Sequence, residues 1–245
     1  MSCAFIFPGQ GSQTVGMGRD VACAFKSARE VFDEIDDVLG QNLSKLIFEG
    51  PEEDLILTEN AQPAIMAVSL AVMRVLSVDG GIDLSKTATC VAGHSLGEYS
   101  SLAASGCFEL ADTARLLKTR GRAMQEAVPV GEGAMAALVG LDLADIVSIA
   151  LEASEDGVCN AANDNAPGQV VVSGDTAAVG RAIELAMKRG AKRAIKLPVS
   201  APFHCALMAP AADAMTEALA SVSMSQLSVP VVCNVTASVN TDILK

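Results

Sequence analysis

The feature that most constrains this chain is a serine between two glycines, where strand-like sequence changes into helix-like sequence. Residues 87–92 form a short apolar, β-branched run that predicts a buried strand, and residues 96–105 have a helical pattern. Where the two meet, Gly93–Gly97 reads G-H-S-L-G. A sharp strand-to-helix turn of this kind exposes the serine oxygen at its tip, with the helix N-terminus behind it. An ordinary serine in a glycine-flanked turn is the alternative, but the flanking elements favour an α/β fold that exposes Ser95.

The second half of the chain has a different order of elements. Its pattern predicts strands at residues 134–140, 158–162, 169–173 and 192–197, and helices at 143–153 and 175–189. We expect Asp175 to cap the second of these helices. The order β-α-β-β-α-β is that of a ferredoxin-like unit. We therefore predict a small inserted domain at residues 130–197, within a large α/β domain made of residues 1–129 and 198–245.

The predicted elements of the large domain begin with a strand at residues 3–7, followed by a glycine-rich loop from Pro8 to Gly18. Helices are predicted at 19–39, ended by Gly40, and at 61–78, 110–126 and 210–222, with a last strand at 229–235.

Composition excludes several classes of function. The 245-residue chain carries 17 basic and 29 acidic residues, a net charge of −12, and 3% aromatic residues. Nucleic-acid binding needs a positive surface and, for single strands, aromatic stacking, so we expect no nucleic-acid partner. The apolar run at residues 63–76 is shorter than the roughly 18 residues of a membrane-spanning helix, so we expect no membrane segment. The N-terminus lacks the basic region of a signal peptide.

Seven cysteines are scattered along the chain without a C-x-x-C pair. We expect reduced, mostly buried thiols, which indicates a cytoplasmic protein. The chain has only two histidines, His94 and His204, and neither stands at ligand spacing from a cysteine pair. We therefore expect no metal site.

The histidine count also decides which base could activate Ser95. His94 is adjacent to the serine, so its side chain projects elsewhere from the sharp turn. His204 is the only other histidine, in a loop after Pro198 and Pro202. If the chain is a serine acyl-transfer enzyme, His204 is the base by elimination. A hydrogen-bonded loop histidine is the alternative.

The helix predicted at 110–126 carries a basic residue on its apolar face. The neighbours of Arg120 one turn away, Leu116, Leu117, Ala123 and Met124, are all apolar. A guanidinium that emerges from a buried face needs an anion, because an unpaired buried charge is costly. That anion is either a protein carboxylate or a substrate carboxylate held in a two-pronged clasp.

The loop at Pro8–Gln13 reads P-G-Q-G-S-Q and lacks the G-K-[ST] ending of a phosphate loop, so we expect no nucleotide binding. A glycine loop at this point can bring a backbone N–H beside the serine. That group would be the second donor of an oxyanion hole, the first being the N–H of Leu96. A plain tight turn is the alternative.

Five motifs occur in the order seen in one family. They are F-P-G-Q-G-S-Q at Phe7–Gln13, G-H-S-L-G-E at Gly93–Glu98, R-G-R-A-M-Q at Arg120–Gln125, N-A-P-G-Q-V-V-V-S-G at Asn165–Gly174 and A-P-F-H at Ala201–His204. The chain resembles the malonyl-CoA:acyl-carrier-protein transacylases of bacterial type II fatty acid synthesis. It is also similar to the acyltransferase domains of polyketide synthases. The resemblance implies a hydrolase-like, parallel-sheet α/β domain with a ferredoxin-like insert.

The resemblance also implies the roles of single residues. Ser95 matches the nucleophile, and His204 matches the general base that later acts as acid. Gln10 and Leu96 correspond to the backbone oxyanion donors, and Arg120 to the arginine that binds the free carboxylate of malonyl. Two further residues, Asn165 and Gln169, match a loop close to the active site. Finally, Phe203 and Leu96 resemble the malonyl-preferring versions of their motifs.

The implied activity is ping-pong transfer of malonyl from coenzyme A, through an ester on Ser95, to the phosphopantetheine thiol of an acyl carrier protein in fatty acid biosynthesis. It implies no bound cofactor, malonyl-CoA as the substrate and an acyl carrier protein as the partner. Two alternatives stay open: a serine esterase or thioesterase, and a catalytically weak fragment that binds carrier protein.

Two further expectations concern the chain end and its charge. Family members continue beyond the point that matches Lys245, with a segment that helps to orient the histidine, so we expect a truncated chain or one that closes differently. Carrier proteins are acidic, so docking on an acidic chain needs a local basic surface. We expect five cations to contribute to this docking surface: Lys188, Arg189, Lys192, Arg193 and Lys196. The alternative is that they lie on a solvated helix end and strand edge and bind no partner.

Overall fold

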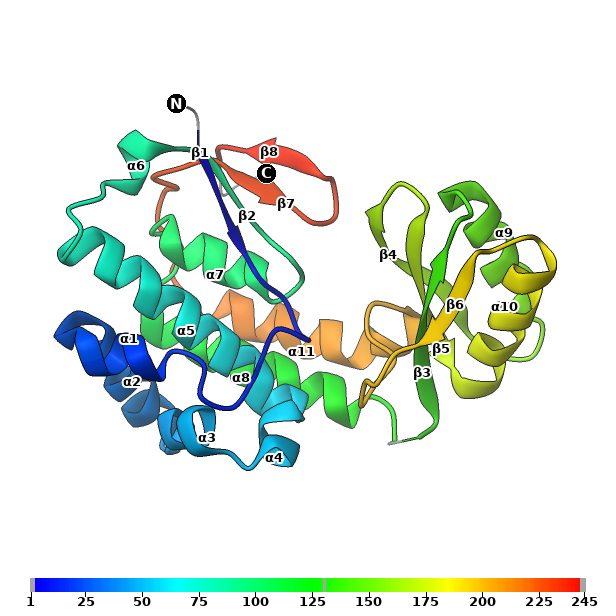
Figure 1. Ribbon diagram of the computed structural model, residues 1–245, viewed down its shortest axis with the longest axis horizontal. Helices are drawn as coiled ribbons and strands as arrows, with labels where there is room; N and C mark the ends of the chain where they lie inside the picture. Colours follow the sequence, from blue (N-terminus) through cyan, green and yellow to red (C-terminus); the bar gives the residue numbers. More distant parts are fainter. Residues whose placement is uncertain (1–2, 130, 243–245) are drawn as a thin grey trace. The chain divides into compact units, whose positions relative to one another are not determined.

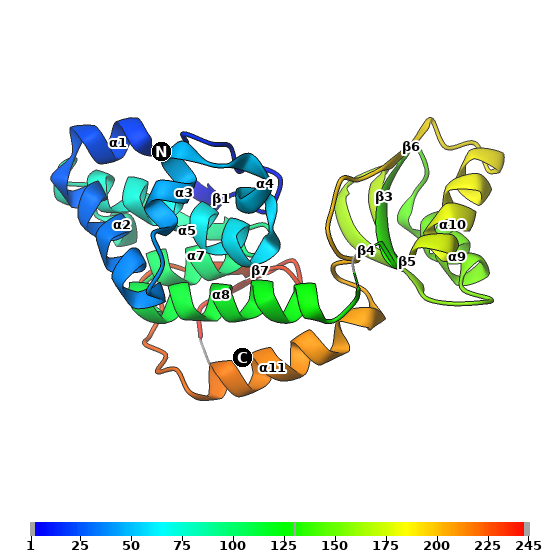
Figure 2. The same cartoon turned by 90° about the horizontal axis from the view of Figure 1, so that it is seen from below.

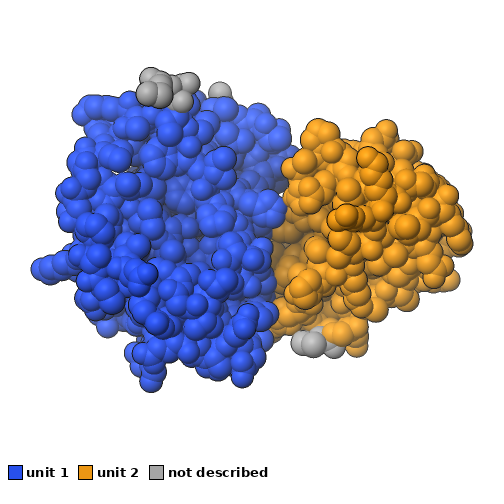
Figure 3. Space-filling model, viewed as in Figure 1, with its two compact units in different colours: residues 1–121, 215–245 blue, residues 122–214 orange. Residues whose placement is uncertain are grey.

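The structure is a computed structural model that describes residues 3–129 and 131–242 (Figure 1). The chain divides into two compact units, coloured separately in Figure 3. Unit 1 comprises Met1–Gly121 and Met215–Lys245, and unit 2 comprises Arg122–Ala214. The insert predicted at residues 130–197 falls within unit 2, although residue 130 itself, like residues 243–245, lies outside the described part. The domain division at residues 130 and 197 stays a prediction.

The sheet of unit 1 has the strand order β1-β2-β7-β8. Strands β1 (Cys3–Phe7), β2 (Ala88–Gly93) and β7 (Val231–Cys233) are parallel, and β8 (Ser238–Asn240) returns antiparallel to β7. Figure 1 shows β2 between the blue β1 and the red β7. The last strand is shorter than the predicted 229–235, because residues 234–237 form the turn into β8, an unpredicted strand.

The helices of unit 1 follow the predicted pattern with three short additions, α3, α4 and α6. They are α1 (Arg19–Ala24), α2 (Lys26–Leu39), α3 (Leu43–Glu49), α4 (Glu52–Ile56), α5 (Thr58–Val78), α6 (Leu84–Thr87), α7 (Gly97–Ala104), α8 (Leu110–Glu126) and α11 (Ala209–Ala220). Helices α8 and α11 each include a unit boundary.

The prediction of one helix over residues 19–39 is wrong. Two helices are present, because Phe25 adopts an extended conformation (φ −125°, ψ 125°) between α1 and α2. The apolar spacing does not register this break, since Ala22 before it and Val31 after it are both buried. Gly40 ends α2 with a left-handed φ of 57°, as predicted.

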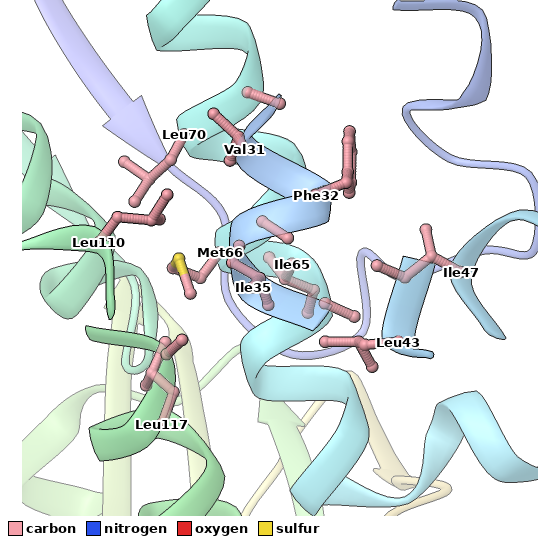
Figure 4. Packing of buried hydrophobic residues seen from close by; sticks show 14 of the residues in the cluster. Val31, Phe32, Ile35, Leu43, Ile47, Ile65, Met66, Leu70, Leu110 and Leu117 are labelled. Carbon is pink, nitrogen blue, oxygen red and sulfur yellow. The ribbon is translucent and has the colours of Figure 1, made fainter. Parts of the chain in front are cut away.

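Helix α5 lies in the main apolar core of unit 1. Figure 4 shows its Ile65, Met66 and Leu70 among the packed side chains of this core, which include Phe32 and Leu117. By length and composition alone α5 could cross a membrane, with a mean hydropathy of 1.6 over an 18-residue window. Because 44% of that window is buried inside the protein, α5 fits the role of a core helix.

Unit 2 has the predicted β-α-β-β-α-β order. Its elements are β3 (Gly133–Val139), α9 (Leu143–Ala153), β4 (Cys159–Ala166), β5 (Gln169–Asp175), α10 (Thr176–Lys188) and β6 (Arg193–Lys196). The sheet order is β4-β5-β3-β6 with antiparallel neighbours, the arrangement of a ferredoxin-like unit. Apolar residues of α9 and α10, such as Ile146, Ile149 and Val179, pack with this sheet in one buried cluster.

Asp175 occupies the N-cap position of α10, but its side chain makes no capping hydrogen bond. Its carboxylate instead accepts a hydrogen bond from the Val158 N–H (2.5 Å). The predicted N-cap position of Asp175 is confirmed, but its carboxylate ties the end of β5 to the segment before β4 instead of bonding to the first turn of α10.

All seven cysteines are free thiols, but the expectation that most are buried is wrong. Only Cys107 and Cys159 are buried, whereas Cys3 and Cys23 are exposed and the other three are intermediate. The sequence pattern overestimates burial because exposed cysteines occur at the strand β1 and the helix α1, each of which has one solvent-facing side.

Candidate active site

Strand β2 ends at Gly93, and the chain reverses into α7 over the next three residues. Ser95 has a φ of 53°, a left-handed conformation that costs a residue other than glycine about 1–2 kcal/mol. A Cβ on Gly93 would lie 1.9 Å from the backbone C and O of Gly97, and one on Gly97 would lie 2.5 Å from the Phe7 carbonyl oxygen. Both glycines are therefore required, and the predicted sharp strand-to-helix turn is confirmed.

The glycine-rich loop after β1 lies against this turn. The N–H of His94 donates to the Phe7 carbonyl (3.0 Å), and a Cβ on Gly9 would lie 2.5 Å from His94 Nδ1. Among the described residues, the backbone N–H groups of Gln10 and Leu96 have no hydrogen-bond acceptor. Both N–H groups are thus available to an oxygen of a substrate, which is the property that an oxyanion hole requires.

Arg120 reaches the serine from α8. Its Nη2 donates a hydrogen bond to Ser95 Oγ (3.2 Å), and its Nη1 donates to Gln62 Oε1 (2.6 Å) on α5. The two helices approach closely at Gly121, where an added Cβ would lie 2.5 Å from the Thr58 carbonyl oxygen. This close approach brings the arginine of one helix to the glutamine of the other.

Arg120 is buried, as its apolar neighbours predicted, with 9% of the residue exposed. Burial lowers the pKa of its guanidinium, which lies 5.7 Å from the centroid of the Tyr99 ring. Within residues 3–129 and 131–242, no carboxylate forms an ion pair with Arg120. Of the two anions expected for this arginine, a protein carboxylate in direct contact is therefore not found in the described chain, although the Glu98 carboxylate partly offsets the lowered pKa of Arg120 from a greater distance.

Buried polar side chains connect Arg120 to the glycine-rich loop. Gln62 Nε2 donates to Thr58 Oγ1 (2.9 Å), and Thr58 Oγ1 donates to Gln10 Oε1 (2.9 Å). Thr58 is 0% exposed and Gln62 is 1% exposed. These neutral groups hold the guanidinium in place without compensating its positive charge.

Asn234, directly after β7, bonds to both sides of the turn at Ser95. Its Oδ1 accepts from the Ser95 N–H (2.7 Å), and its Nδ2 donates to the Gly93 carbonyl (2.6 Å). Its own N–H donates to the Glu98 carboxylate (3.1 Å), and burial raises the pKa of that carboxyl group. Asn234 thus links the end of β7 to the turn and to the first turn of α7.

Thr58, Gln62 and Asn234 were not predicted from the sequence, although each leaves a signal there. Thr58 and Gln62 are polar residues in the first turns of α5, a helix that is mostly apolar from Pro63 onward. Asn234 follows the carboxyl end of a strand parallel to β2, the edge at which α/β sheets place their ligand sites. Such signals identify candidates but not their partners.

The predicted base lies in unit 2. His204 has a left-handed φ of 62° and belongs to the loop between β6 and the 3₁₀ helix η1 (Ala206–Met208). Phe203 beside it is 7% exposed and packs in an apolar cluster of unit 2. The loop is tied to β4 by a hydrogen bond from the Ala206 N–H to Asn160 Oδ1 (2.9 Å). The backbone around His204 is thus anchored on both sides.

Asn165 and Gln169 lie at the tip of the β4–β5 hairpin rather than in an irregular loop. Asn165 is near the end of β4, Gln169 begins β5, and Ala166 pairs with Gln169 across the turn. Both residues are exposed. The structure therefore places these two predicted site residues together.

The predicted site residues fall into two groups. Ser95, Leu96, Gln10 and Arg120 come together in unit 1, whereas His204, Phe203, Asn165 and Gln169 lie in unit 2. The pairing of Ser95 with His204 stays a prediction, since each unit is described by itself. No group of three or more His, Cys, Asp or Glu that could hold a metal ion occurs in the part of the chain that the structure describes.

The family model described as "Acyl transferase domain" matches residues 4–242, nearly the whole chain. The chain belongs to the acyl transferase family. This acyl transferase is 48% identical over 239 residues to the malonyl CoA-acyl carrier protein transacylase of Escherichia coli K12, covering 98% of this chain and 76% of that protein. It is 47% identical over 240 residues to the Bacillus subtilis protein of the same name, covering 98% of this chain and 74% of that protein.

Solved structures agree with the predicted fold class. The acyl-carrier-protein-S-malonyltransferase of Bartonella henselae has a TM-score of 0.95 and 55% identity to this acyl transferase, covering 99% of this chain and 77% of that chain. A second match is a chain in the structure of a type II polyketide synthase acyl-carrier protein in complex with its malonyl-transacylase. Its TM-score is 0.93 and its identity 43%, covering 99% of this chain and 77% of that chain. The predicted family and the α/β fold with its ferredoxin-like unit are both confirmed.

Proposed function

We propose that this chain transfers a malonyl group from malonyl-CoA to the phosphopantetheine thiol of an acyl carrier protein, in fatty acid biosynthesis. The names of its relatives support this reaction. The observation that carries the proposal is Arg120, a buried cation that bonds to Ser95 Oγ and to the neutral amide of Gln62. A substrate with a carboxylate close to its thioester supplies an ion-pair partner, which Arg120 does not have among the described residues.

In the first half-reaction, Ser95 Oγ attacks the thioester carbonyl carbon of malonyl-CoA and His204 accepts the hydroxyl proton. The carbonyl oxygen becomes an oxyanion, which accepts hydrogen bonds from the N–H groups of Gln10 and Leu96. When the carbon–sulfur bond breaks, His204 returns the proton to the coenzyme A sulfur. A malonyl ester remains on Ser95, and Arg120 holds its free carboxylate.

In the second half-reaction, the phosphopantetheine thiol of the carrier protein attacks the ester carbonyl. His204 takes the thiol proton and then returns it to Ser95 Oγ as the ester bond breaks. The protein needs no bound cofactor for these steps, because phosphopantetheine arrives on the partner. We assign Phe203 to the preference for malonyl, and Asn165 and Gln169 to substrate binding. The free thiols of the chain support a cytoplasmic location.

The test is incubation with radiolabelled malonyl-CoA, followed by acid quenching and peptide mapping. We expect an acid-stable label on Ser95 that is absent from Ser95→Ala and is discharged by holo acyl carrier protein. Absence of label on Ser95 in the unchanged chain would reject the proposal. Label that is lost to water at the same rate with and without carrier protein would instead indicate an esterase.

A further inference from the structure

The side chain of Asn234 makes the two hydrogen bonds that the backbone N–H and C=O of one residue make in a parallel β-ladder. In such a ladder, one residue donates its N–H to the carbonyl before the facing residue and accepts from the N–H after it. Asn234 Nδ2 donates to the Gly93 carbonyl (2.6 Å), and its Oδ1 accepts from the Ser95 N–H (2.7 Å), so the facing residue is His94. The side-chain amide therefore takes the place of the backbone N–H and C=O of one residue.

The sheet explains why a side chain has this position. Strand β7 pairs with β2 at Val91–Val231 and Ala92–Val232, and the chain then leaves the ladder through the turn at residues 234–237 (Figure 1). On the other side of β2, the backbone pairing continues, since the His94 N–H bonds to the Phe7 carbonyl of β1 (3.0 Å). The Asn234 amide thus extends the ladder on the side where the backbone of β7 has turned away.

Both groups that Asn234 bonds belong to the turn that exposes the serine. Ser95 is held at a φ of 53°, and rotation of its backbone toward an ordinary conformation would move its N–H away from Asn234 Oδ1. The N–H of Leu96, one residue further, has no acceptor among the described residues. The amide therefore fixes the Ser95 N–H by a hydrogen bond and leaves the Leu96 N–H available for an oxyanion.

The orientation of the amide follows from its partners, because the Ser95 N–H can only donate and the Gly93 carbonyl can only accept. Asn234 is itself anchored, since its backbone N–H donates to the Glu98 carboxylate (3.1 Å) at the start of α7. Asn234 is an exposed residue, so its side chain adds little to the apolar core. Its contacts are thus concentrated on the turn.

We propose that Asn234 is a positioning residue that holds the strand-to-helix turn in the conformation presenting Ser95 Oγ to the substrate. It acts through Ser95 and does not touch the reacting atoms. The inference rests on the proposed role of Ser95 as nucleophile, but not on malonyl as the substrate.

Two variants of the full chain separate the contributions of the amide. Asn234→Ala removes both hydrogen bonds. Asn234→Asp keeps the size and the acceptor for the Ser95 N–H, but its carboxylate cannot donate to the Gly93 carbonyl. Asn240→Ala is the matched control, because Asn240 Nδ2 donates to Cys233 Sγ (3.2 Å) within the same β7–β8 hairpin.

The first measurement is the rate at which a fluorophosphonate modifies Ser95, a reaction that forms an Oγ–phosphorus bond and releases fluoride. The second is kcat and KM for malonyl transfer, and thermal unfolding of each variant accompanies both. We expect the two Asn234 variants to be modified about tenfold more slowly, or slower still. We also expect a similar loss in kcat with KM unchanged within about twofold. Asn240→Ala should keep the rates of the unchanged chain.

Modification of Asn234→Ala at the unchanged rate would overturn the proposal. An equal loss in Asn240→Ala would also overturn it, because the effect would then belong to the stability of the hairpin. If the unchanged chain reacts with the fluorophosphonate but not with malonyl-CoA, the proposed substrate is wrong, while slower modification of the Asn234 variants still supports the positioning role. An unchanged chain that reacts with neither reagent would overturn both.

Discussion

The Arg120 guanidinium donates one hydrogen bond to Ser95 Oγ (3.2 Å) and another to the neutral amide of Gln62 (2.6 Å). A buried cation usually pairs with a carboxylate, because removing a charge from water is costly. Here both hydrogen-bond partners are neutral, and no carboxylate within residues 3–129 and 131–242 forms an ion pair with the cation, although the Glu98 carboxylate acts on it at longer range. This relationship favours a substrate that brings its own carboxylate to the serine.

Arg120→Ala should abolish the discrimination between malonyl and acetyl groups. Loss of a charge-assisted pair worth about 3 kcal/mol lowers kcat/KM for malonyl transfer roughly hundredfold. Acetyl transfer should change little, because acetyl has no carboxylate. Arg120→Lys keeps the charge but not the two-pronged geometry, so its kcat/KM for malonyl transfer should lie between those of the unchanged chain and Arg120→Ala. Parallel assays with malonyl-CoA and acetyl-CoA measure this, and equal losses for both would indicate a generic acyl site such as that of an esterase or thioesterase.

Gln62→Glu should weaken the malonyl preference without touching Arg120 itself. A carboxylate at this position would pair with Arg120 Nη1 and compensate its charge, so we expect the malonyl-to-acetyl rate ratio to fall about tenfold or more. Gln62→Met is the control, since it removes the hydrogen-bond acceptor without adding charge and should slow both transfers while keeping their ratio. Retention of the full malonyl preference by Gln62→Glu would contradict this account.

Gly93→Ala should prevent folding or lower the free energy of unfolding by more than about 3 kcal/mol. The added Cβ would lie 1.9 Å from the backbone C and O of Gly97, so the backbone must move. Gly180 in α10 offers a matched control, because a Cβ there meets nothing within 4 Å. Gly180→Ala should raise the free energy of unfolding by about 0.5–1 kcal/mol. Urea unfolding followed by circular dichroism compares the variants, and unchanged stability of Gly93→Ala would show that the turn is looser than described.

Carrier-protein docking by the basic residues of unit 2 stays a prediction, which the structure makes more specific. Arg189 already pairs with Glu152 and donates to Ser148 Oγ (3.1 Å), whereas no ion pair of the other four cations occurs among the described residues. Lys192→Glu with Arg193→Glu should therefore raise the apparent KM for carrier protein about three- to tenfold at low salt, and less at high salt.

The matched control for docking is Arg189→Gln, which should have a small effect because Glu152 already compensates that charge. Steady-state assays over a range of carrier-protein and salt concentrations provide the comparison. An unchanged KM for the double charge reversal at low ionic strength would count against this surface.

Cys159, like the other buried cysteine Cys107, should resist alkylation in the folded protein. Burial raises its pKa to about 11, so only about one thiol in a thousand is ionised at pH 8. At pH values below that pKa, its rate of alkylation should rise about tenfold for each unit by which the pH is increased, because the thiolate is the reactive form. Iodoacetamide labelling with mass mapping should modify the exposed Cys23 first and Cys159 only on unfolding. Early modification of Cys159 in the folded protein would contradict its burial.

Several local features were predicted correctly from the sequence. The sharp turn at Ser95 follows from two glycines, since only residues without a Cβ permit the contacts at Gly93 and Gly97. The burial of Arg120 follows from its apolar neighbours one helical turn away. The element order of unit 2 follows from apolar periodicity. Each of these features depends on residues that are close together in the chain.

The errors have a common cause. The break at Phe25, the turn that shortens β7 and the bond from Val158 to Asp175 each depend on where a segment meets its neighbours in space. Apolar periodicity reports which side of an element is buried, but it does not report a one-residue break or the hydrogen-bond partner of a polar side chain.

The sequence by itself determined which residues could carry chemistry, Ser95, His204 and Arg120 among them, because residue type and turn geometry are local properties. The tertiary structure decided the partners of Arg120 and of the turn. Gln62 lies 58 positions from Arg120, and Asn234 lies 139 positions from Ser95. They meet only because α8 packs on α5 and β7 pairs with β2, and hydrogen bonds across such distances in sequence depend on packing in three dimensions.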